Sequence, residues 1–342
     1  MRQLTFIKPG QALEWQEVAE PKLEGPGEAL VRPVAVASCD LDSAVVHGHT
    51  PWQEGPFAFG HEFVAEVVEV GSEVDSFKVG QLVIVPFQLS CGKCARCLAG
   101  LTGSCTTVRA GAMYGLAPLG GECGGALSDL VRVPFAEAML LAVPAGIQPA
   151  TIASLSDNVS DAWRAVGPYL EQTPNVPVLI MGGAMAGSIG LYAVAIAAAL
   201  KAERIDYVDN DPTRLEMAQK LGANPIEAKE NLPKRFGFYP ITVDASADPK
   251  GLVAALRSTD AGGVCTSTAI YFKPVALPLL EMYTIGVTFK TNRVHSRVTT
   301  PKVLELVKSG QLHPELVTSD LAPWEEAGEA FLSYKTKLIV TR

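Results

Sequence analysis

The chain has 342 residues, of which 48% are apolar and 19% charged; this is the composition of an ordinary folded protein of about two domains and excludes a disordered one. The net charge is −8 and the chain has no block of Lys or Arg, so it lacks the basic footprint that nucleic acid or an anionic membrane requires. We therefore expect small-molecule partners. The opening MRQLTFIKPG lacks the apolar core of a signal peptide, which predicts a cytoplasmic protein.

The first part of the chain has the pattern of β-strands. Residues 29–38, 62–71 and 79–87 cluster or alternate β-branched side chains, and Gly71 and Gly80 interrupt them as turn residues. We predict a mostly antiparallel β region over about the first 150 residues.

From Thr151 onward the pattern alternates between helix and strand, which predicts a doubly wound α/β domain. Asp211 and Pro212 have the residue types of a helix N-cap and first helical position. After about residue 290 we expect a helix over 301–310, then a terminal strand over 336–342 that has no βαβ partner and returns to the first domain. The predicted strands of the α/β domain are residues 178–181, 204–209, 241–244 and 264–270, with a helix around 252–257.

One segment is long and apolar enough to suggest a membrane span. Residues 178–200 contain no charge, but they include four glycines and divide into a short apolar run, a glycine cluster and an Ala-rich segment. That order is typical of a buried strand, a phosphate-binding turn and a helix, so we predict no membrane contact.

Four of the seven cysteines lie in the spacing C-x2-C-x2-C-x7-C, formed by Cys91, Cys94, Cys97 and Cys105. In a reducing compartment, clustered cysteines are more often metal ligands than disulfides. Four thiolates complete the coordination of Zn²⁺, which predicts a structural zinc site. An iron–sulfur cluster is the alternative, but the long last spacing and the missing Cys-Pro speak against it. Four unliganded buried cysteines are a weaker alternative still.

A second group of residues has the types that hold a catalytic metal. Cys39 follows a predicted strand, His61 and Glu62 stand in FGHEF, and Asp157 lies where the α/β half begins. A cysteine, a histidine and a carboxylate can bind zinc and leave room for water or substrate. Each residue alone is weak evidence, and a surface or core His–Glu pair is the plain alternative.

Together these residues resemble the zinc-containing medium-chain alcohol dehydrogenases. The resemblance extends over essentially the whole chain and rests on Cys39 with Asp42, Gly60-His61-Glu62, the four-cysteine loop, a glycine turn, VDNDPTRLEMAQKLGA and DAS. It implies a partly open, GroES-like β-barrel catalytic domain over residues 1–152 and 291–342, with a zinc lobe at about 88–108. It also implies a Rossmann NAD-binding domain over residues 153–290.

The resemblance further implies the site residues. Cys39, His61 and Asp157 are expected to hold the catalytic zinc, with Glu62 beside them as an occasional fourth ligand or neighbouring acid. The expected NAD-binding residues are Gly182, Gly183, Gly187, Ser188, Ile189, Gly190, Asp209, Asn210 and Arg214.

The glycine turn departs from the family pattern GxGxxG, because GGAMAGSIG has about two extra residues before Gly187 and Gly190. The backbone can still approach a pyrophosphate at the start of the helix. Asp209 closes a predicted strand 19 residues after Gly190, where an acid is expected to bind the adenosine ribose hydroxyls. Asp209 would repel a 2′-phosphate, so we expect NAD to be preferred over NADP by about tenfold or more.

A second departure concerns the proton path. Leu41 and Ala44 occupy the positions at which the family has a Ser or Thr and a His that carry the alcohol proton to solvent. His47 is the ambiguous remaining candidate. Trp52 and Trp163 are expected to be packing residues, although Trp163 could also line a substrate pocket.

The sequence thus predicts reversible hydride transfer between an alcohol and NAD, with two zinc ions per chain. The alternatives are a polyol, sugar or aldehyde dehydrogenase on the same scaffold, and a quinone-reducing or non-catalytic NAD-binding relative without zinc chemistry. The resemblance implies a homotetramer, with a homodimer as the alternative, paired along strand edges near residues 263–272 and 287–290.

Overall fold

The computed structural model describes residues 1–51, 55–116, 120–121, 123–183 and 185–342, so Trp52 and Ala184 lie outside the described residues. The chain packs into two compact units. The first unit comprises Met1–Ser160, Val294–Lys308 and Thr318–Arg342, and the second comprises Asp161–Arg293 and Ser309–Val317. The change of unit at Ser160 falls inside helix α5 (Asn158–Gln172), whereas the sequence pattern places the boundary near residue 152.

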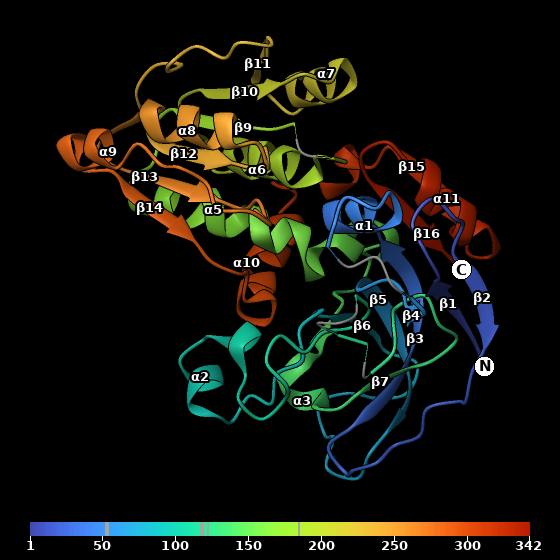
Figure 1. Ribbon diagram of the computed structural model, residues 1–342. Helices are drawn as coiled ribbons and strands as arrows, with labels where there is room; N and C mark the ends of the chain where they lie inside the picture. Colours follow the sequence, from blue (N-terminus) through green and yellow to red (C-terminus); the bar gives the residue numbers. More distant parts are fainter. Residues whose placement is uncertain (52–54, 117–119, 122, 184) are drawn as a thin grey trace. The chain divides into compact units, whose positions relative to one another are not determined.

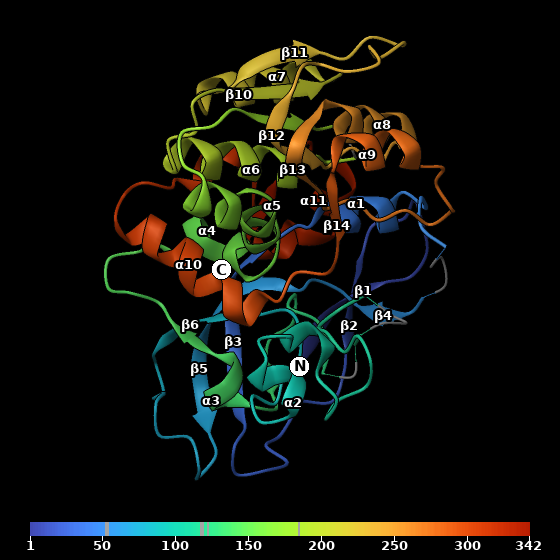
Figure 2. The ribbon, with the colours of Figure 1, turned by 90° about the vertical axis from the view of Figure 1, so that its left-hand side faces the viewer.

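The first unit is built mostly on antiparallel strands, as predicted (Figures 1 and 2). Its larger sheet has the order β15-β16-β3-β5-β6-β8, with β7 also paired to β3, and a smaller sheet has the order β2-β1-β4. The strands are β1 (Arg2–Phe6), β2 (Glu14–Glu17), β3 (Ala29–Ala37), β4 (Phe57–Ala58), β5 (Glu62–Val70), β6 (Leu82–Val85), β7 (Val131–Val133), β8 (Leu141–Ala142), β15 (Asp320–Pro323) and β16 (Leu338–Thr341).

Strands β3 and β5 form the longest antiparallel pair of this unit. The pairing shifts register between Leu30 and Val31 and again between Pro33 and Ala35. A proline has no N–H to donate to a neighbouring strand, so it is tolerated at such an irregularity. Strand β3 ends at Ala37, and Ser38 and Cys39 connect it to the first helix.

The C-terminal segment corrects one prediction. The terminal strand β16 does return to the first unit and pairs with β3, but it also has a parallel partner in β15. Helix α11 (Ala327–Ser333) lies between these two strands along the chain, so they form a short parallel crossover unit. The prediction of no βαβ partner was wrong because β15 has only four residues and ends in a proline, which hides the strand pattern.

The second unit contains a six-stranded sheet in which every pairing is parallel, with the order β11-β10-β9-β12-β13-β14 (Figure 1). The order reverses direction beside β9, as in a doubly wound fold. This confirms the predicted fold class. The strands are β9 (Val178–Met181), β10 (Ile205–Asp209), β11 (Asn224–Glu227), β12 (Tyr239–Asp244), β13 (Thr259–Ser267) and β14 (Thr288–Thr291).

Helix α7 of the second unit begins at the residues that the sequence indicates, whereas α8 begins earlier than predicted. Asp211 caps α7 (Pro212–Lys220), and its side chain accepts hydrogen bonds from the N–H groups of Thr213 and Arg214. Asp248 caps α8 (Pro249–Ser258) in the same way. The expected helix at 252–257 is therefore longer than predicted, and the strand expected to end at residue 270 ends at Ser267.

The long apolar segment that suggested a membrane span divides into β9 and α6 (Ser188–Ala199). Both are buried, which explains why α6 is apolar on nearly all sides. Within the described ranges, no helix is long and apolar enough to cross a membrane. The remaining helices are α1 (Asp40–Val46), α2 (Ala95–Leu98), η1 (Thr102–Ser104), α3 (Ala136–Met139), α4 (Pro149–Ile152), η2 (Ala153–Ser156), α9 (Leu279–Ile285), α10 (Ser296–Lys308), η3 (Pro314–Val317) and η4 (Trp324–Glu326).

Candidate active site and metal centres

The four cysteines of the loop lie together in the first unit. Their sulfur atoms are all within 4.8 Å of one another, and the sulfurs of Cys94 and Cys105 are 3.9 Å apart. Four thiolates at about 2.3 Å from a central Zn²⁺ lie about 3.8 Å from one another, so this spacing fits a tetrahedral zinc ion. Every corner is a cysteine, which leaves no position for a substrate.

Hydrogen-bond donors around this loop favour the ionised thiolates that zinc requires. The N–H groups of Lys93 and Cys94 point at the sulfur of Cys91, at 3.4 and 3.3 Å. The side chain and N–H of Thr106 are the main cause that lowers the pKa of Cys94, to about 5. Oriented N–H groups stabilise negative sulfur at Cys91 and Cys94, whereas burial raises the pKa of Cys97 to about 12, so the fourfold ionised loop needs a bound cation. It is a four-cysteine site of the structural zinc type.

The second group also forms a cluster, although its members are far apart in sequence. The candidate ligand atoms of Cys39, His61, Glu62 and Asp157 lie within 4.8 Å of one another, and all four residues are buried. Nε2 of His61 is 3.3 Å from a carboxylate oxygen of Asp157. The cluster has the residue types of a Cys/His/Glu catalytic zinc site.

Each of these side chains is positioned by the end of an element. Cys39 is the N-cap of α1, and its N–H donates to the carboxylate of Asp42 at 2.8 Å. Glu62 begins β5 directly after His61. Asp157 lies between η2 and α5.

Asp42 connects the first turn of α1 to the histidine. One of its carboxylate oxygens is 3.6 Å from Nδ1 of His61, and both atoms are buried without a hydrogen-bond partner in the described residues. A carboxylate beside the second nitrogen of a metal-binding histidine fixes the ring orientation and tautomer. The placement leaves Nε2 of His61 directed toward the cluster.

The acidic groups of this cluster would be stabilised by a bound cation. Burial raises the pKa of the Cys39 thiol well above its ordinary value, and the nearby carboxylates of Asp157 and Glu62 raise it further. Burial lowers the pKa of His61, but Asp42 and Asp157 outweigh it and raise the value to about 9. Several acidic groups packed together out of water are costly unless a positive charge joins them. A divalent metal would supply that charge, so the donor set fits zinc.

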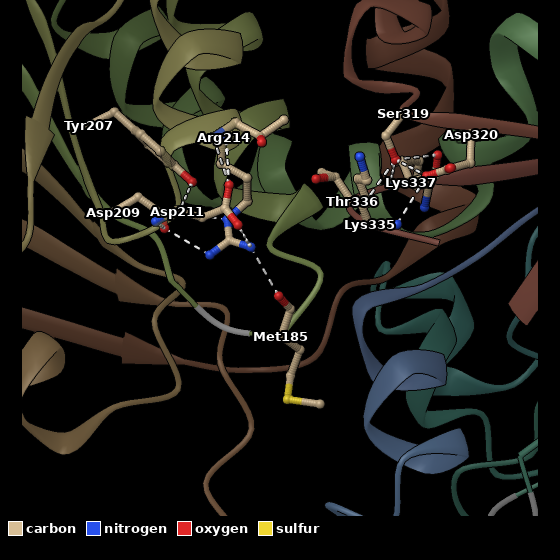
Figure 3. A network of polar contacts seen from close by, with 11 residues as sticks. Met185, Tyr207, Asp209, Asp211, Arg214, Ser319, Asp320, Lys335, Thr336 and Lys337 are labelled. Atoms are coloured by element: carbon tan, nitrogen blue, oxygen red, sulfur yellow. Dashed lines mark hydrogen bonds and ion pairs between the residues drawn. The ribbon is translucent and has the colours of Figure 1, made fainter. Parts of the chain in front are cut away.

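Sequence reasoning missed one residue of this centre, Lys337. It is completely buried, its ammonium group is 2.9 Å from Glu62, and it also donates to the main-chain oxygen of Ser38. The only feature of the sequence that could have indicated this role is the position of Lys337 directly before the apolar terminal strand. Lys337 belongs to the polar group drawn in Figure 3, in which its N–H donates to the hydroxyl of Ser319 at 2.9 Å.

The residues at the expected proton-path positions have no side chain that can carry a proton. Ala44 is buried and Leu41 is partly buried, both on α1. His47 ends that helix, is exposed, and its Nδ1 donates to the main-chain oxygen of Ser43 at 2.8 Å. Its ring stacks on His49, with centroids 6.3 Å apart.

In the second unit, the glycine turn joins β9 to α6 and uses conformations that favour glycine. Gly183 and Gly187 have φ angles of +107° and +72°, and Gly187 is the N-cap of α6. Ser188 and Ile189 open the helix, so their N–H groups belong to its first turn. A Cβ atom on Gly190 would lie 3.3 Å from the ring of Tyr207, which shows how closely helix and strand approach here.

Asp209 ends β10 beside this turn, as predicted, but its carboxylate is already bonded within the protein (Figure 3). Nε and Nη2 of Arg214 donate to its two oxygens at 2.9 and 2.8 Å. The hydroxyl of Tyr207 and the N–H of Asp211 donate at 2.6 and 2.9 Å. The sequence predicted Asp209 and Arg214 as neighbours of the cofactor, but it gave no sign of their mutual ion pair.

A pocket of about 230 Å³ lies next to Asp209 at the carboxyl ends of the strands. Gly182, Gly183, Asp209 and Asn210 line it, so the structure brings these four predicted residues together. Other lining residues are Lys229, Glu230, Ser246, Asp248 and Lys250. Ligands of doubly wound folds bind at this edge. Trp163, by contrast, is buried against Gly167 of its own helix, as a packing residue would be.

Comparisons with known proteins agree with these sites. Two family profiles match, the alcohol dehydrogenase GroES-like domain over residues 25–145 and the zinc-binding dehydrogenase domain over residues 188–309. Together they cover more than two thirds of the chain. The zinc-type alcohol dehydrogenase B of Aspergillus flavus is 28% identical over 350 residues, which cover 97% of this chain and 78% of that protein.

Solved structures show the same fold over the whole chain. The alcohol dehydrogenase TADH of Thermus sp. ATN1 superposes with a TM-score of 0.89 at 28% identity and covers 100% of this chain and 99% of that one. An Escherichia coli alcohol dehydrogenase solved with NADH has a TM-score of 0.80 at 23% identity and covers 100% and 99% of the two chains. The protein is a zinc-dependent, NAD(P)-linked oxidoreductase of the alcohol dehydrogenase type, and it belongs to the zinc-containing medium-chain alcohol dehydrogenase family.

Proposed function

We propose that the protein transfers a hydride reversibly between a primary or secondary alcohol and NAD. The observation that carries this proposal is the buried cluster of Cys39, His61, Glu62 and Asp157, whose donor atoms lie within 4.8 Å of one another. The four-cysteine loop cannot serve instead, because four thiolates leave no coordination position open.

In this proposal Cys39, His61 and Asp157 would hold the catalytic zinc. When bound, zinc polarises the substrate oxygen and lowers the pKa of the alcohol. Asp42 holds the imidazole of His61 in one orientation from the far side of its ring. Lys337 balances the charge of Glu62 and keeps that carboxylate beside the cluster. The four side chains are themselves buried, which would keep most bulk water from the ion that they hold.

The glycine turn and the edge of the parallel sheet would hold NAD. The first N–H groups of α6, at Ser188 and Ile189, suit a pyrophosphate because the start of a helix attracts anions. The pocket beside Asp209 and Asn210 suits the adenosine half of the cofactor. The cofactor supplies the hydride acceptor, and the protein orients it.

The alcohol proton would leave through water rather than through a side chain. Leu41 and Ala44 supply no group that exchanges protons, and the apolar Leu41 would disfavour small, strongly hydrated alcohols. His47 is exposed and bonded to its own helix, which supports a path that does not use it.

The protein is further proposed to assemble as a homotetramer. Strand β14 pairs only with β13 in the described part of the sheet and so offers an edge, and the neighbouring helix α9 has no buried residue. Both features favour pairing of two copies along this edge.

The proposed function is tested by a screen of alcohols and aldehydes that follows NADH absorbance. The variant His61→Ala should lose zinc from the catalytic site and abolish turnover, yet it should remain folded and bind NADH. The exposed histidine His313 provides the matched control, His313→Ala, which should keep full activity. Turnover of alcohols by the His61→Ala variant, or one zinc or none in the carefully purified wild type, would refute the proposal.

A further inference from the structure

The candidate metal ligand Asp157 lies in a turn that depends on its neighbours for a fixed position. It follows η2, a 3₁₀ turn of four residues, and precedes α5. Its N–H donates to the main-chain oxygen of Ser154 at 3.3 Å. Short 3₁₀ turns have poor hydrogen-bond geometry, so contacts with other elements must fix them in place. The position of the Asp157 carboxylate is therefore set by the elements that hold η2.

Strand β5 holds one side of η2. The N–H of Phe63 donates to the hydroxyl of Ser156 at 3.1 Å. Ser156 directly precedes Asp157, and Phe63 directly follows Glu62. This contact fixes the turn against the strand that begins at the metal cluster.

Helix α10 holds η2 through Thr300. Oγ1 of Thr300 is 3.1 Å from the main-chain oxygen of Leu155 and 3.1 Å from Oγ of Ser160. Oγ of Ser160 is itself 2.6 Å from the oxygen of Leu155. All three residues are completely buried, so water does not compete for these contacts. Two hydroxyl groups thus converge on one carbonyl, two residues before Asp157.

The four-cysteine loop in turn holds the start of α10. The N–H of Gly103 donates to Nδ1 of His295 at 3.1 Å, and the side-chain amide of Gln88 donates to the main-chain oxygen of Val294 at 2.9 Å. Both acceptors lie directly before the first helical residue, Ser296. The helix packs against η1 of the loop and also against η2. The loop therefore supports the helix that holds the turn of Asp157.

We propose that Thr300 is a positioning residue for the catalytic metal, because it fixes η2 from α10 and so holds the Asp157 carboxylate beside Cys39 and His61. The inference rests on the proposed function, in which Asp157 is one of the zinc ligands. It gives α10 a role at the metal centre, although the helix contributes no ligand to it. A ligand that becomes ordered only when the metal binds lowers the affinity, because ordering costs conformational entropy.

The variant Thr300→Val removes the hydroxyl and keeps the branched shape of the side chain. The Kd of the catalytic site for Co²⁺, a coloured substitute for zinc, should rise about tenfold. This is the lower end of the 10- to 100-fold that is typical of a lost outer partner, since Thr300 acts on Asp157 through the main chain. Thr300→Ser keeps the hydroxyl, so its Kd should stay within about threefold of the wild type, below that range.

A buried threonine of the second unit provides the matched control. Oγ1 of Thr259 is 3.0 Å from the main-chain oxygen of Ala255 and 2.8 Å from the hydroxyl of Thr242. It therefore has the same surroundings as Thr300, a carbonyl and a second hydroxyl, but these partners belong to the second unit, whereas the metal cluster belongs to the first. Thr259→Val should lower the Tm about as much as Thr300→Val and leave the Kd for Co²⁺ unchanged.

The experiment removes zinc with a chelator, titrates Co²⁺ and follows the visible absorption, with circular dichroism to verify that each variant is folded. The variant His61→Ala lacks the catalytic site and identifies the signal of the four-cysteine loop. A raised Kd in Thr300→Val, but not in Thr300→Ser or Thr259→Val, supports the inference. An unchanged Kd in Thr300→Val, or an equal rise in all three variants, would overturn it and leave Thr300 as a support of the fold.

A second variant keeps the test decisive if Thr300→Val does not fold. Ser160→Ala removes the other hydroxyl from the oxygen of Leu155; a raised Kd supports the inference and an unchanged Kd contradicts it. The failure of the proposed function has a different signature. In that case the wild type itself would bind Co²⁺ at the four-cysteine loop alone.

Discussion

Lys337 shows how a single buried side chain completes a centre that otherwise contains too many acids. Its ammonium group is 2.9 Å from Glu62 and is completely buried, so neither group can rely on water for solvation. A buried charge is tolerated when it is paired and hydrogen-bonded, and the main-chain oxygen of Ser38 supplies a further bond. This pairing ties the C-terminal strand to the start of β5 and α1, the elements that position His61 and Cys39.

His47 should contribute little to turnover. It is exposed, and its Nδ1 is bonded to the main-chain oxygen of Ser43, so the proposed path to water does not involve it. His47→Asn should change kcat for alcohol oxidation by less than about threefold, well below the 10²–10⁴ that is typical of a lost general base. Steady-state kinetics with one good alcohol substrate measures this.

The neighbouring histidine provides the control for that experiment. His49 is also exposed and stacks on His47, so His49→Asn reports the effect of disturbing the ring pair alone. A loss beyond tenfold in His47→Asn but not in His49→Asn, with zinc content and NADH binding intact, would identify His47 as the proton relay.

At the scale of elements, the four-cysteine loop should stabilise the fold through its metal. The loop is linked to α10, because the N–H of Gly103 donates to Nδ1 of His295 at 3.1 Å. Metal binding to such a site is partly folding energy. Cys94→Ser should remove one of two zinc ions per chain and lower the Tm by about 5–10 °C, on the order expected for a loss of a few kcal/mol in a protein of this size.

Metal analysis and a thermal melt measure these two effects together. Cys123 is a cysteine outside both clusters, so Cys123→Ser should keep two zinc ions and a Tm close to wild type. An unchanged zinc count in Cys94→Ser would show that the loop does not hold the metal.

How much of this the sequence predicts depends on the separation of the residues involved. The four cysteines lie within one loop, so their spacing alone indicates a shared metal. Cys39, His61 and Asp157 come from three distant segments, and only the family resemblance joins them. Lys337 is still further away along the chain. The ion pair of Asp209 with Arg214 was missed for another reason: both residues were identified, but a pattern does not state which side chains bond to each other.

Strand β15 illustrates the same limit for an element. Its four residues, Asp320–Pro323, are too few to show alternation, and its parallel pairing with β16 depends on α11 folding back between them. By contrast β9 and β10 were predicted almost to the residue, since β9 is a continuous buried apolar run before a glycine turn, and β10 is buried throughout and ends at an acid.

At the scale of the whole molecule, the edge of the parallel sheet is the surface where we expect copies to pair. Leu280 and Tyr283 on α9 are 78% and 85% exposed, which is unusual for large apolar side chains on one short helix. Strand β14 beside it is the end of the six-stranded sheet, and an uncovered edge pairs readily with a second copy. The double variant Leu280→Glu and Tyr283→Glu should therefore reduce the mass measured by light scattering from that of a tetramer to that of a dimer or monomer.

The double variant should weaken association strongly. Burying one large apolar side chain contributes roughly 1.5–3 kcal/mol, and a charged glutamate at the same position opposes burial in the contact. Leu321 on β15 is 75% exposed and provides the control: Leu321→Glu adds a charge at an exposed leucine of a different sheet and should keep the mass of the wild type. A monomeric mass for the wild type at micromolar concentration would contradict the proposed assembly, and a tetrameric mass for the double variant would place the contact on another surface.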